Sequence, residues 1–261
     1  MDTTQFWEAR ARRFAGRGAG LQAVCSYAMP GFYNWAIDVT QRAALKDSMD
    51  SVGPNLEVMD YGCGIGRWSR EAARRGAKVT AIDFSASMIE EARRRTESVS
   101  LPGSCRFVQS DVCSIDLTER FDLILGVTVL QHLLDDARLT QAIARLANHL
   151  RPGGRLVMVE AAPSRADHRG NTVTFRARPL ATYLAGIEAA GLEVIAVRGV
   201  DPIPFKLWVI PQFKRLPRPV AVGVLALATL LSLPLDLLLA RLATRHSWHK
   251  VIVAQARGGR P

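Results

Sequence analysis

Hydrophobic residues between positions 55 and 200 follow two alternating spacings, which predict strands and helices in turn. Short apolar runs, typical of buried strands, occur at 56–62, 77–84, 105–111, 121–130 and 155–161. Apolar residues at helical spacing fill the intervening segments 67–76, 85–95 and 135–150. Strands that alternate with helices form a mostly parallel sheet with helices on both faces. The pattern therefore predicts an α/β fold built around such a sheet.

The two ends of the chain have a different pattern. The N-terminal segment reads as helical, and a turn-forming cluster, Ser-Val-Gly-Pro-Asn, follows it. Near the C-terminus, a helix at 178–191 and strands at 192–200 and 249–256 enclose a proline-rich segment. We therefore expect three parts: a helical N-terminal cap at 1–50, a core at 51–201 plus 248–257, and a hydrophobic helical insertion at 202–247.

The insertion contains the most apolar stretch of the chain, residues 220–240, with basic residues on both sides. No charge occurs from Val220 to Leu235, but this run is shorter than the about 20 residues that span a bilayer. The last strand must also return to pair beside the strand before the insertion. We therefore expect two helices bent near Pro234. They could form a wall of an apolar substrate pocket, an interfacial membrane contact or plain core packing.

Composition narrows the classes of protein. The 261 residues are 48% hydrophobic, which is normal for a globular core and argues against global disorder. A formal net charge of +10 favours anionic partners, although arginine-rich surfaces also occur without such a role. The four cysteines have no metal-type spacing and are expected to be reduced thiols. The N-terminus has no apolar signal core, so we expect no secretory export.

A glycine-rich loop after the first predicted strand is the strongest motif. Its glycines allow the backbone to approach a ligand closely, and they are Gly62, Gly64 and Gly66. The third glycine comes two positions after the second, whereas the dinucleotide-binding fingerprint needs three. Asp60, just before the loop, suits a cationic amino group and would repel a pyrophosphate. Asp83, at the end of the next strand, can accept hydrogen bonds from ribose hydroxyls.

Five segments in order resemble the class I S-adenosylmethionine-dependent methyltransferases, particularly the small-molecule group of ubiquinone/menaquinone and type 11/12-like enzymes. They are VMDYGCGIG, VTAIDFS, VQSDV, FDLILGVTVLQHL and LRPGGRLVMVE. The resemblance covers about 55–200 and extends to the final strand. It implies a Rossmann-like, doubly wound, seven-stranded and mostly parallel sheet with an antiparallel last strand. It also implies S-adenosylmethionine as the cofactor.

The resemblance assigns a role to each expected cofactor residue. Asp60 would lie near the amino group of the methionine part, and Asp83 would hold the ribose diol. Gly62, Gly64 and Gly66 would line the methionine and ribose part. The residues that would contact adenine are Phe84, Met88, Asp111 and Val112. Gly126 and Gln131 would lie near the methionine. Core packing of Phe84 and Met88, and a turn-forming role for Asp111, are the alternatives.

Two side chains are candidates for proton transfer. His132 follows the fourth-motif strand, where this family places residues that face the substrate, so it is the first candidate for a general base. A structural or helix-capping histidine is the alternative. Glu160 ends the fifth-motif strand on the same side of the sheet and is the second candidate. A base is needed only if the acceptor must lose a proton.

Further side chains are candidates for contact with the acceptor. Tyr33 and Trp35, in the helical cap, could close over the site or pack in the core. Five basic residues could meet a phosphate or carboxylate, or form a solvated surface: Arg176, Arg178, Lys206, Lys214 and Arg215. His168 lies in a polar loop and is expected to be solvated. No metal-ligating cluster stands out, so we expect no metal.

The sequence thus predicts a methyltransferase that acts on an O, N or C atom of a small, amphiphilic, lipid-like or prenylated metabolite. Alternatives are a cofactor-binding regulatory protein on the same fold, an RNA methyltransferase and, more weakly, a dehydrogenase. Nucleic acid is disfavoured because the fourth motif lacks an Asn/Asp-Pro-Pro-aromatic signature and no nucleic-acid-binding module is visible. We expect a cytoplasmic protein. A peripheral location at the anionic inner face of the membrane is the alternative. The oligomeric state is not predicted.

Overall fold

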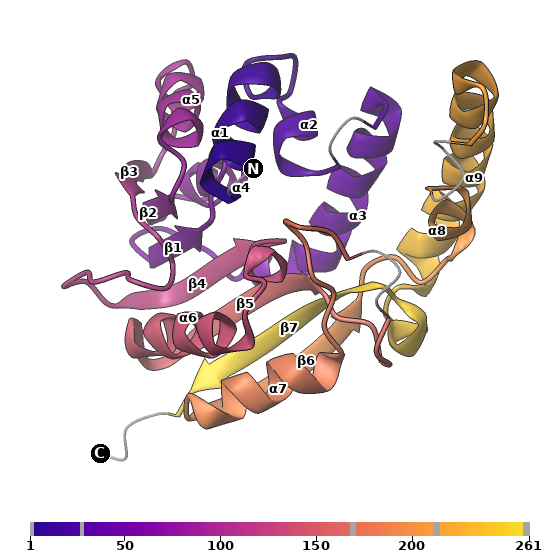
Figure 1. Ribbon diagram of the computed structural model, residues 1–261. Helices are drawn as coiled ribbons and strands as arrows, with labels where there is room; N and C mark the ends of the chain where they lie inside the picture. The colour runs from indigo at the N-terminus through magenta and orange to yellow at the C-terminus, as the bar shows by residue number, and fades with distance from the viewer. Residues whose placement is uncertain (1–2, 27–28, 168–170, 211–214, 258–261) are drawn as a thin grey trace.

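A seven-stranded sheet forms the centre of the computed structural model, which describes residues 3–26, 29–167, 171–210 and 215–257 (Figure 1). Its strand order is β3-β2-β1-β4-β5-β7-β6, and only β7 runs against the others. The predicted fold, with its antiparallel last strand, is confirmed. The strands are β1 (Glu57–Tyr61), β2 (Lys78–Asp83), β3 (Ser104–Gln109), β4 (Phe121–Val127), β5 (Leu150–Ala161), β6 (Leu192–Gly199) and β7 (His249–Ala256).

Helices cover both faces of this sheet. One face packs its apolar side chains against α6 (Asp136–Asn148) and α7 (Leu180–Ala189). The other face packs against α3 (Gly31–Asp50), α4 (Arg67–Arg74) and α5 (Ala86–Glu97). The central strands β1, β2, β4 and β7 are buried on both sides, which explains their nearly continuous apolar runs. The edge strands β3 and β6 have exposed positions.

The N-terminal helices lie over the ends of the first strands. Helix α1 (Thr3–Phe14) contacts α5, and the short α2 (Leu21–Val24) contacts α3 (Figure 1). Phe14 and Ala23 join a third apolar cluster with Ile65, which lies in the glycine loop. The cap is therefore anchored to the loop that carries the strongest sequence motif.

A single helix, α9 (Arg218–Leu239), occupies the insertion after the short α8 (Phe205–Val209) and before the 3-10 turn η3 (Thr244–His246). The prediction of two helices is wrong, because Pro234 lies inside one continuous helix. Proline removes a backbone donor, but tertiary contacts can hold the helix together. Here the buried Asp236 pairs with Lys206 of α8 at 2.7 Å, and α9 also packs against α3.

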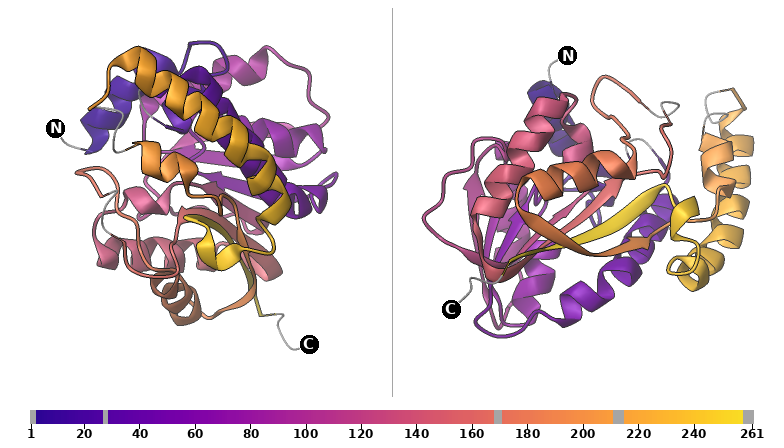
Figure 2. Two further views of the ribbon diagram at one scale, coloured as in Figure 1. Left: turned by 90° about the vertical axis from the view of Figure 1, so that its right-hand side faces the viewer. Right: turned by 90° about the horizontal axis from the view of Figure 1, so that it is seen from below.

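By length and composition, α9 could cross a membrane, and it is the one such helix among the residues that the structure describes. Only 28% of its most apolar window is buried inside the protein. In Figure 2 it lies lengthwise across one outer side of the molecule. The core helix of a soluble protein is mostly buried. The low burial of α9 therefore distinguishes it from such a helix.

Gly126→Ala in β4 should lower the free energy of unfolding by about 1–3 kcal/mol, the usual cost of overpacking a core. A Cβ there would lie 2.0 Å from the ring of Tyr61 on the neighbouring strand. Urea denaturation measures the effect. Gly223→Ala is the matched control, because a Cβ there meets nothing within 4 Å. Equal stability of the two variants would contradict the close packing of Gly126 on Tyr61.

Candidate cofactor and acceptor site

The glycine loop turns the chain from β1 into α4 and exposes its backbone. Gly62 and Gly64 both have positive φ, at 62° and 52°. A Cβ at Gly62 would lie 2.5 Å from Val129, and one at Gly64 would lie 2.6 Å from Val24. Only glycine therefore fits these two positions without strain.

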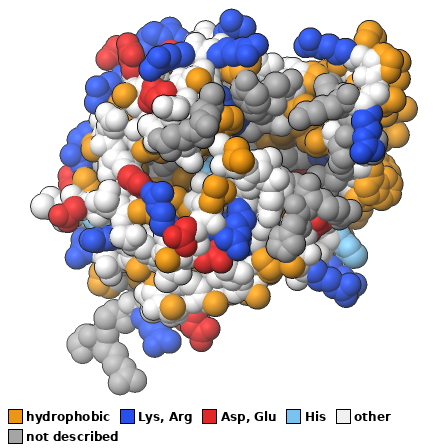
Figure 3. Space-filling model, viewed as in Figure 1, with side chains coloured by type: hydrophobic (Ala, Val, Ile, Leu, Met, Phe, Trp, Pro, Cys, Tyr) orange, Lys and Arg blue, Asp and Glu red, His pale blue; other side chains and the backbone are white. Residues whose placement is uncertain are grey.

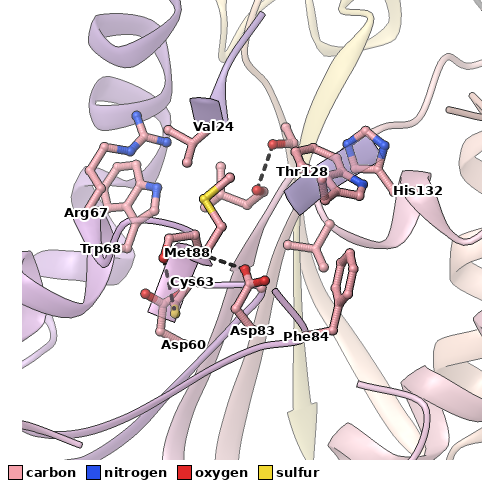
Figure 4. A pocket seen from close by; sticks show the side chains of 15 residues that line it. Val24, Asp60, Cys63, Arg67, Trp68, Asp83, Phe84, Met88, Thr128 and His132 are labelled. Atoms are coloured by element: carbon pink, nitrogen blue, oxygen red, sulfur yellow. Dashed lines mark hydrogen bonds between the residues drawn. The ribbon is translucent and has the colours of Figure 1, made fainter. Parts of the chain in front are cut away.

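Two adjoining hollows lie beside this loop. Both are near the carboxyl ends of the central strands, where ligands bind in open α/β sheets. Because they share lining residues, they form one elongated site. Figure 4 shows the residues that line the first hollow. The shared residues are Trp7, Gly62, Asp83, Phe84, Val129 and His132.

Two buried carboxylates line this site. Asp60 accepts a hydrogen bond from the hydroxyl of Ser69 at 2.5 Å, and burial raises the pKa of Asp60 to about 7. Asp83 accepts from the backbone N–H groups of Gly64 and Ser85, each at 2.9 Å. Burial raises the pKa of Asp83 to about 6. The hydrogen bond to Gly64 ties the glycine loop to the end of β2.

Three N–H donors belong to side chains that line the first hollow. The guanidinium carbon of Arg67 lies 4.8 Å from the centre of the Trp68 ring (Figure 4). Trp7, on α1, also lines this hollow. Among the residues that the structure describes, Nε1 of Trp7, Nε of Arg67 and Nε1 of Trp68 are buried without a hydrogen-bond partner. Such donors suit a ligand with acceptor atoms, for example a carboxylate.

Sequence reasoning missed these three residues. A tryptophan or arginine at helical spacing carries no local sign of the cavity that it lines. Only the packing of α1 against α2 and α5 brings Trp7 to this site.

The second hollow extends past Asp83 towards α6. Phe84 lies between the two hollows, with Asp111 and Val112 farther along. The carboxylate of Asp111 accepts from the N–H of Cys113 at 2.9 Å and pairs with Arg138 at 2.7 Å. The structure thus brings together eight of the expected cofactor residues: Asp60, Gly62, Gly64, Asp83, Phe84, Met88, Asp111 and Val112.

Three other expected cofactor residues do not line either hollow. Gly66 is the N-cap of α4, and Gly126 packs on the Tyr61 ring. The side chain of Gln131 accepts from the N–H of Ala161 at 2.9 Å. The next three residues after Gly126 line the site instead, because β4 ends at Val127 and the chain turns at Thr128, whose φ is +58°.

His132 lines both hollows from the turn η1 (Leu130–His132). Its Nδ1 lies 2.6 Å from the carbonyl oxygen of Thr174, so Nδ1 carries the proton and Nε2 is left as an acceptor. The ring packs between Trp7 and Phe175, at centroid distances of 4.7 and 6.0 Å. Desolvation lowers the pKa of His132 to about 4, so the ring is neutral near pH 7.

Glu160, the second candidate for proton transfer, does not line either hollow. Its carboxylate is fully buried and accepts from three successive backbone N–H groups at 2.9–3.2 Å: those of Val129, Leu130 and Gln131. Burial raises the pKa of Glu160 to about 7. The side chain thus caps the turn that presents His132, and its contact with the site is indirect.

The expected acceptor contacts also lie away from the hollows. Tyr33 is buried on α3, whereas Trp35 is 55% exposed. Arg176 and Arg178 both pair with Asp136, and each donates to a carbonyl of the loop before α6. These arginines therefore hold that loop, whose two leucines line the second hollow.

The other candidate positions do not extend the site. Lys206 pairs with Asp236, and Arg215 lies on the exposed stretch before α9. His168 and Lys214 lie outside the described residues. Across the described part of the chain, no group of three or more His, Cys, Asp or Glu side chains is arranged to hold a metal ion.

The strand order, the glycine loop and the two strand-end carboxylates define a domain of the class I methyltransferase type. Residues 58–154 match the family described as "Methyltransferase domain". Residues 58–154 thus form a methyltransferase domain with the class I fold, and the cofactor of this family is S-adenosylmethionine.

Known relatives agree with this assignment. A trans-aconitate 2-methyltransferase of Deinococcus radiodurans is 37% identical over 153 residues, which cover 58% of this chain and 53% of that protein. A ubiquinone biosynthesis O-methyltransferase of Methylocella silvestris is 38% identical over 99 residues, which cover 38% of this chain and 37% of that protein. The chain therefore spans about half the length, or less, of these curated relatives.

A solved structure extends the similarity to the whole fold. The magnesium protoporphyrin IX methyltransferase of Synechocystis PCC 6803, with bound SAM, superposes with a TM-score of 0.61. It is 19% identical, and the match covers 98% of both chains. At this identity the similarity concerns the fold alone.

Glu160→Gln should lower the free energy of unfolding by about 1–3 kcal/mol, the usual cost of leaving a buried donor unpaired. The amide NH2 would replace one of the two oxygens that accept from the η1 backbone, so two donors would face each other. Urea denaturation measures the loss. Glu193→Gln, at an exposed position of β6, is the control. Equal stability of both variants with the wild type would show that the cap contributes nothing.

Proposed function

We propose that this chain transfers a methyl group from S-adenosylmethionine to an O, N or C atom of a small, amphiphilic metabolite. The observation that carries the proposal is the single elongated site. It combines the glycine loop, two buried carboxylates, three unpartnered N–H donors and a neutral histidine. This set fits a cofactor with an amino group, a carboxylate, a ribose and an adenine.

The polar groups match the parts of this cofactor in order along the site. Asp60 would accept from the amino group, and the N–H groups of Trp7, Arg67 and Trp68 would meet the carboxylate. Asp83 would accept from the ribose hydroxyls. The adenine would lie beyond Asp83 in the second hollow, in contact with Phe84, Met88, Asp111 and Val112.

Once bound, the cofactor supplies a methyl group on a sulfonium, which leaves by in-line displacement. The protein then has to align the acceptor and exclude water. Trp7 and Val24 from the cap and Val129 from the β4 end close the site with apolar surface. His132 would accept a proton from the acceptor at Nε2, because its Nδ1–H is held by the carbonyl of Thr174.

An amphiphilic acceptor is favoured by the apolar walls beside His132. Trp7, Val129, Leu133 and Leu134 line this part of the site. The two relatives, a trans-aconitate 2-methyltransferase and a ubiquinone biosynthesis O-methyltransferase, differ in the process they serve, so they favour a small-molecule acceptor without identifying one. The cytoplasmic location expected from the sequence, with contact to a membrane surface, is part of this proposal.

An assay with methyl-labelled S-adenosylmethionine tests the activity. The acceptor panel contains hydroxylated quinones, prenylated phenols and di- and tricarboxylates. Transfer of label to at least one organic-extractable acceptor is the expected result. Cofactor binding without transfer to any acceptor would favour a regulatory protein. A lack of cofactor binding would overturn the proposal.

Asp83→Asn should weaken S-adenosylmethionine binding by about tenfold or more, since a hydrogen bond to a charged group is worth about 1.5–3 kcal/mol. Because the pKa of Asp83 is about 6, protonation below that pH removes the same acceptor. Wild-type affinity should therefore fall from pH 7 to pH 5, and more steeply than that of the variant. Calorimetry measures both effects. Asp116→Asn, at an exposed position, is the control and should bind like the wild type.

His132→Asn should lower kcat by about 10²–10⁴ for an acceptor that must lose a proton, the usual contribution of a general base. Binding of S-adenosylmethionine should hardly change. Because the pKa of His132 is about 4, the wild-type kcat/KM should show no histidine limb between pH 5 and 8. His246→Asn, at an exposed position, is the control. An unchanged kcat in His132→Asn would show that this residue is not the base.

A further inference from the structure

Helix α9 has an inverted polarity. Its polar side chains point inward, with Thr229, Ser232 and Asp236 between 0% and 6% exposed. Most of its large apolar side chains point outward, although Leu225 is buried, and the most exposed are Leu227 (57%), Leu230 (71%), Leu231 (51%) and Leu238 (72%). A surface helix in water has the opposite arrangement, with an apolar stripe inside and polar residues outside.

The polar side chains on the inner face of α9 have hydrogen-bond or ion-pair partners within the protein. Asp236 pairs with Lys206 at 2.7 Å and accepts from the N–H of Ile203 at 2.9 Å. The hydroxyl of Thr229 donates to the carbonyl of Leu225 at 2.7 Å. Because the contacts of Asp236 reach residues outside the helix, rotating α9 to bury its exposed leucines would break them. The outward leucines therefore belong to the native arrangement.

Basic residues stand at both ends of this apolar face. Arg218 precedes it and Arg245 follows it, both in exposed positions. Arg241 is also exposed, and it pairs with Asp47 of α3 at 2.7 Å. Asp236 is the one acidic residue of the sequence between 215 and 245, and it is buried. Trp208 of the neighbouring α8 is 64% exposed, and tryptophan is enriched where membrane meets water. Figure 3 shows hydrophobic side chains gathered over α9, with basic side chains near them.

We propose that α9 lies in the plane of a membrane surface, with its leucines among the acyl chains and its basic ends on anionic headgroups. Apolar area and attraction to anionic lipids are the two contributions that hold such helices at an interface. In Figure 2, α9 extends across an outer side of the protein along its whole length, so the full face can meet a flat surface. This inference does not depend on the proposed methyl transfer.

A transmembrane orientation conflicts with the contacts of α9. Its C-terminal half is tied to α8 through Asp236 and Lys206, and the strands on either side of the insertion pair with each other at Gly199 and Lys250. A crossing would place the buried ion pair in lipid or break it. Helix α9 also packs against α3, which belongs to the body of the domain.

A second copy of the chain fits this face less well than lipid does. Because both ends of α9 are basic, a partner α9 would bring arginines together in either a parallel or an antiparallel arrangement. Like charges in close contact oppose association. Anionic headgroups would instead neutralise both ends at once.

Flotation of the full chain with vesicles tests the proposal. Vesicles of equal parts phosphatidylglycerol and phosphatidylcholine should carry the protein, and vesicles of phosphatidylcholine alone should carry less. High salt should weaken the binding, since it screens the basic ends. The triple variant Leu227→Gln/Leu230→Gln/Leu238→Gln should bind about tenfold or more weakly. The control variant, Val99→Gln/Val173→Gln/Ile195→Gln, removes three exposed apolar side chains elsewhere and should bind like the wild type.

Further measurements separate the remaining outcomes. Circular dichroism should show that both triple variants are folded, and S-adenosylmethionine binding, measured by calorimetry, should be equal in both. Absence of the folded wild type from both kinds of vesicle would overturn the proposal. So would resistance of the bound protein to alkaline carbonate, which indicates a membrane crossing. A lipid-free dimer that the leucine variant alone dissociates would assign the face to a second copy and also overturn it.

Discussion

The hydrogen bond from the Gly64 N–H to the buried carboxylate of Asp83 connects the features on which the site depends. It ties the loop after β1 to the end of β2, and the second oxygen of Asp83 accepts from Ser85 at the start of α5. Two strands, one loop and one helix therefore meet at a single side chain. Burial raises the pKa of Asp83, and these hydrogen bonds oppose that rise. The resulting pKa of about 6 leaves the carboxylate ionised near neutral pH.

A similar arrangement supports the other wall of the site. Glu160, at the end of β5, accepts the three N–H groups of the turn after β4. This places Val129 and His132 against the hollow, and the Thr174 carbonyl then selects the tautomer of the histidine. In both cases a carboxylate at a strand end organises backbone that faces the ligand. Neighbouring parallel strands end at the same edge of the sheet, so such supports act close together.

The insertion differs from the core in the direction in which its polar and apolar side chains face. In the core, apolar side chains face the sheet and polar groups face water or the site. In α9 the polar side chains face the protein, and most of the leucines face outward. This contrast is local to one helix, while the strands on either side of the insertion keep their regular pairing. A catalytic domain and a surface for an apolar environment can therefore coexist in one fold.

The sequence by itself determined the features that depend on neighbouring residues. Alternating apolar spacing predicted the sheet and its helices, and the Gly62–Gly64 loop with Asp60 and Asp83 marked the site. These signals are local because strand burial, left-handed backbone and strand-end carboxylates are set by a few adjacent positions.

Only the tertiary structure decided which distant side chains complete the site and which way α9 faces. Trp7 and Arg67 reach the hollow through helix packing. The carboxylate of Glu160 points into the protein, where it accepts hydrogen bonds from three backbone N–H groups. Pro234 predicted a break, yet contacts through Asp236 hold one helix together. The physical reason is that burial and pairing depend on neighbours in space, and these neighbours are far apart along the chain.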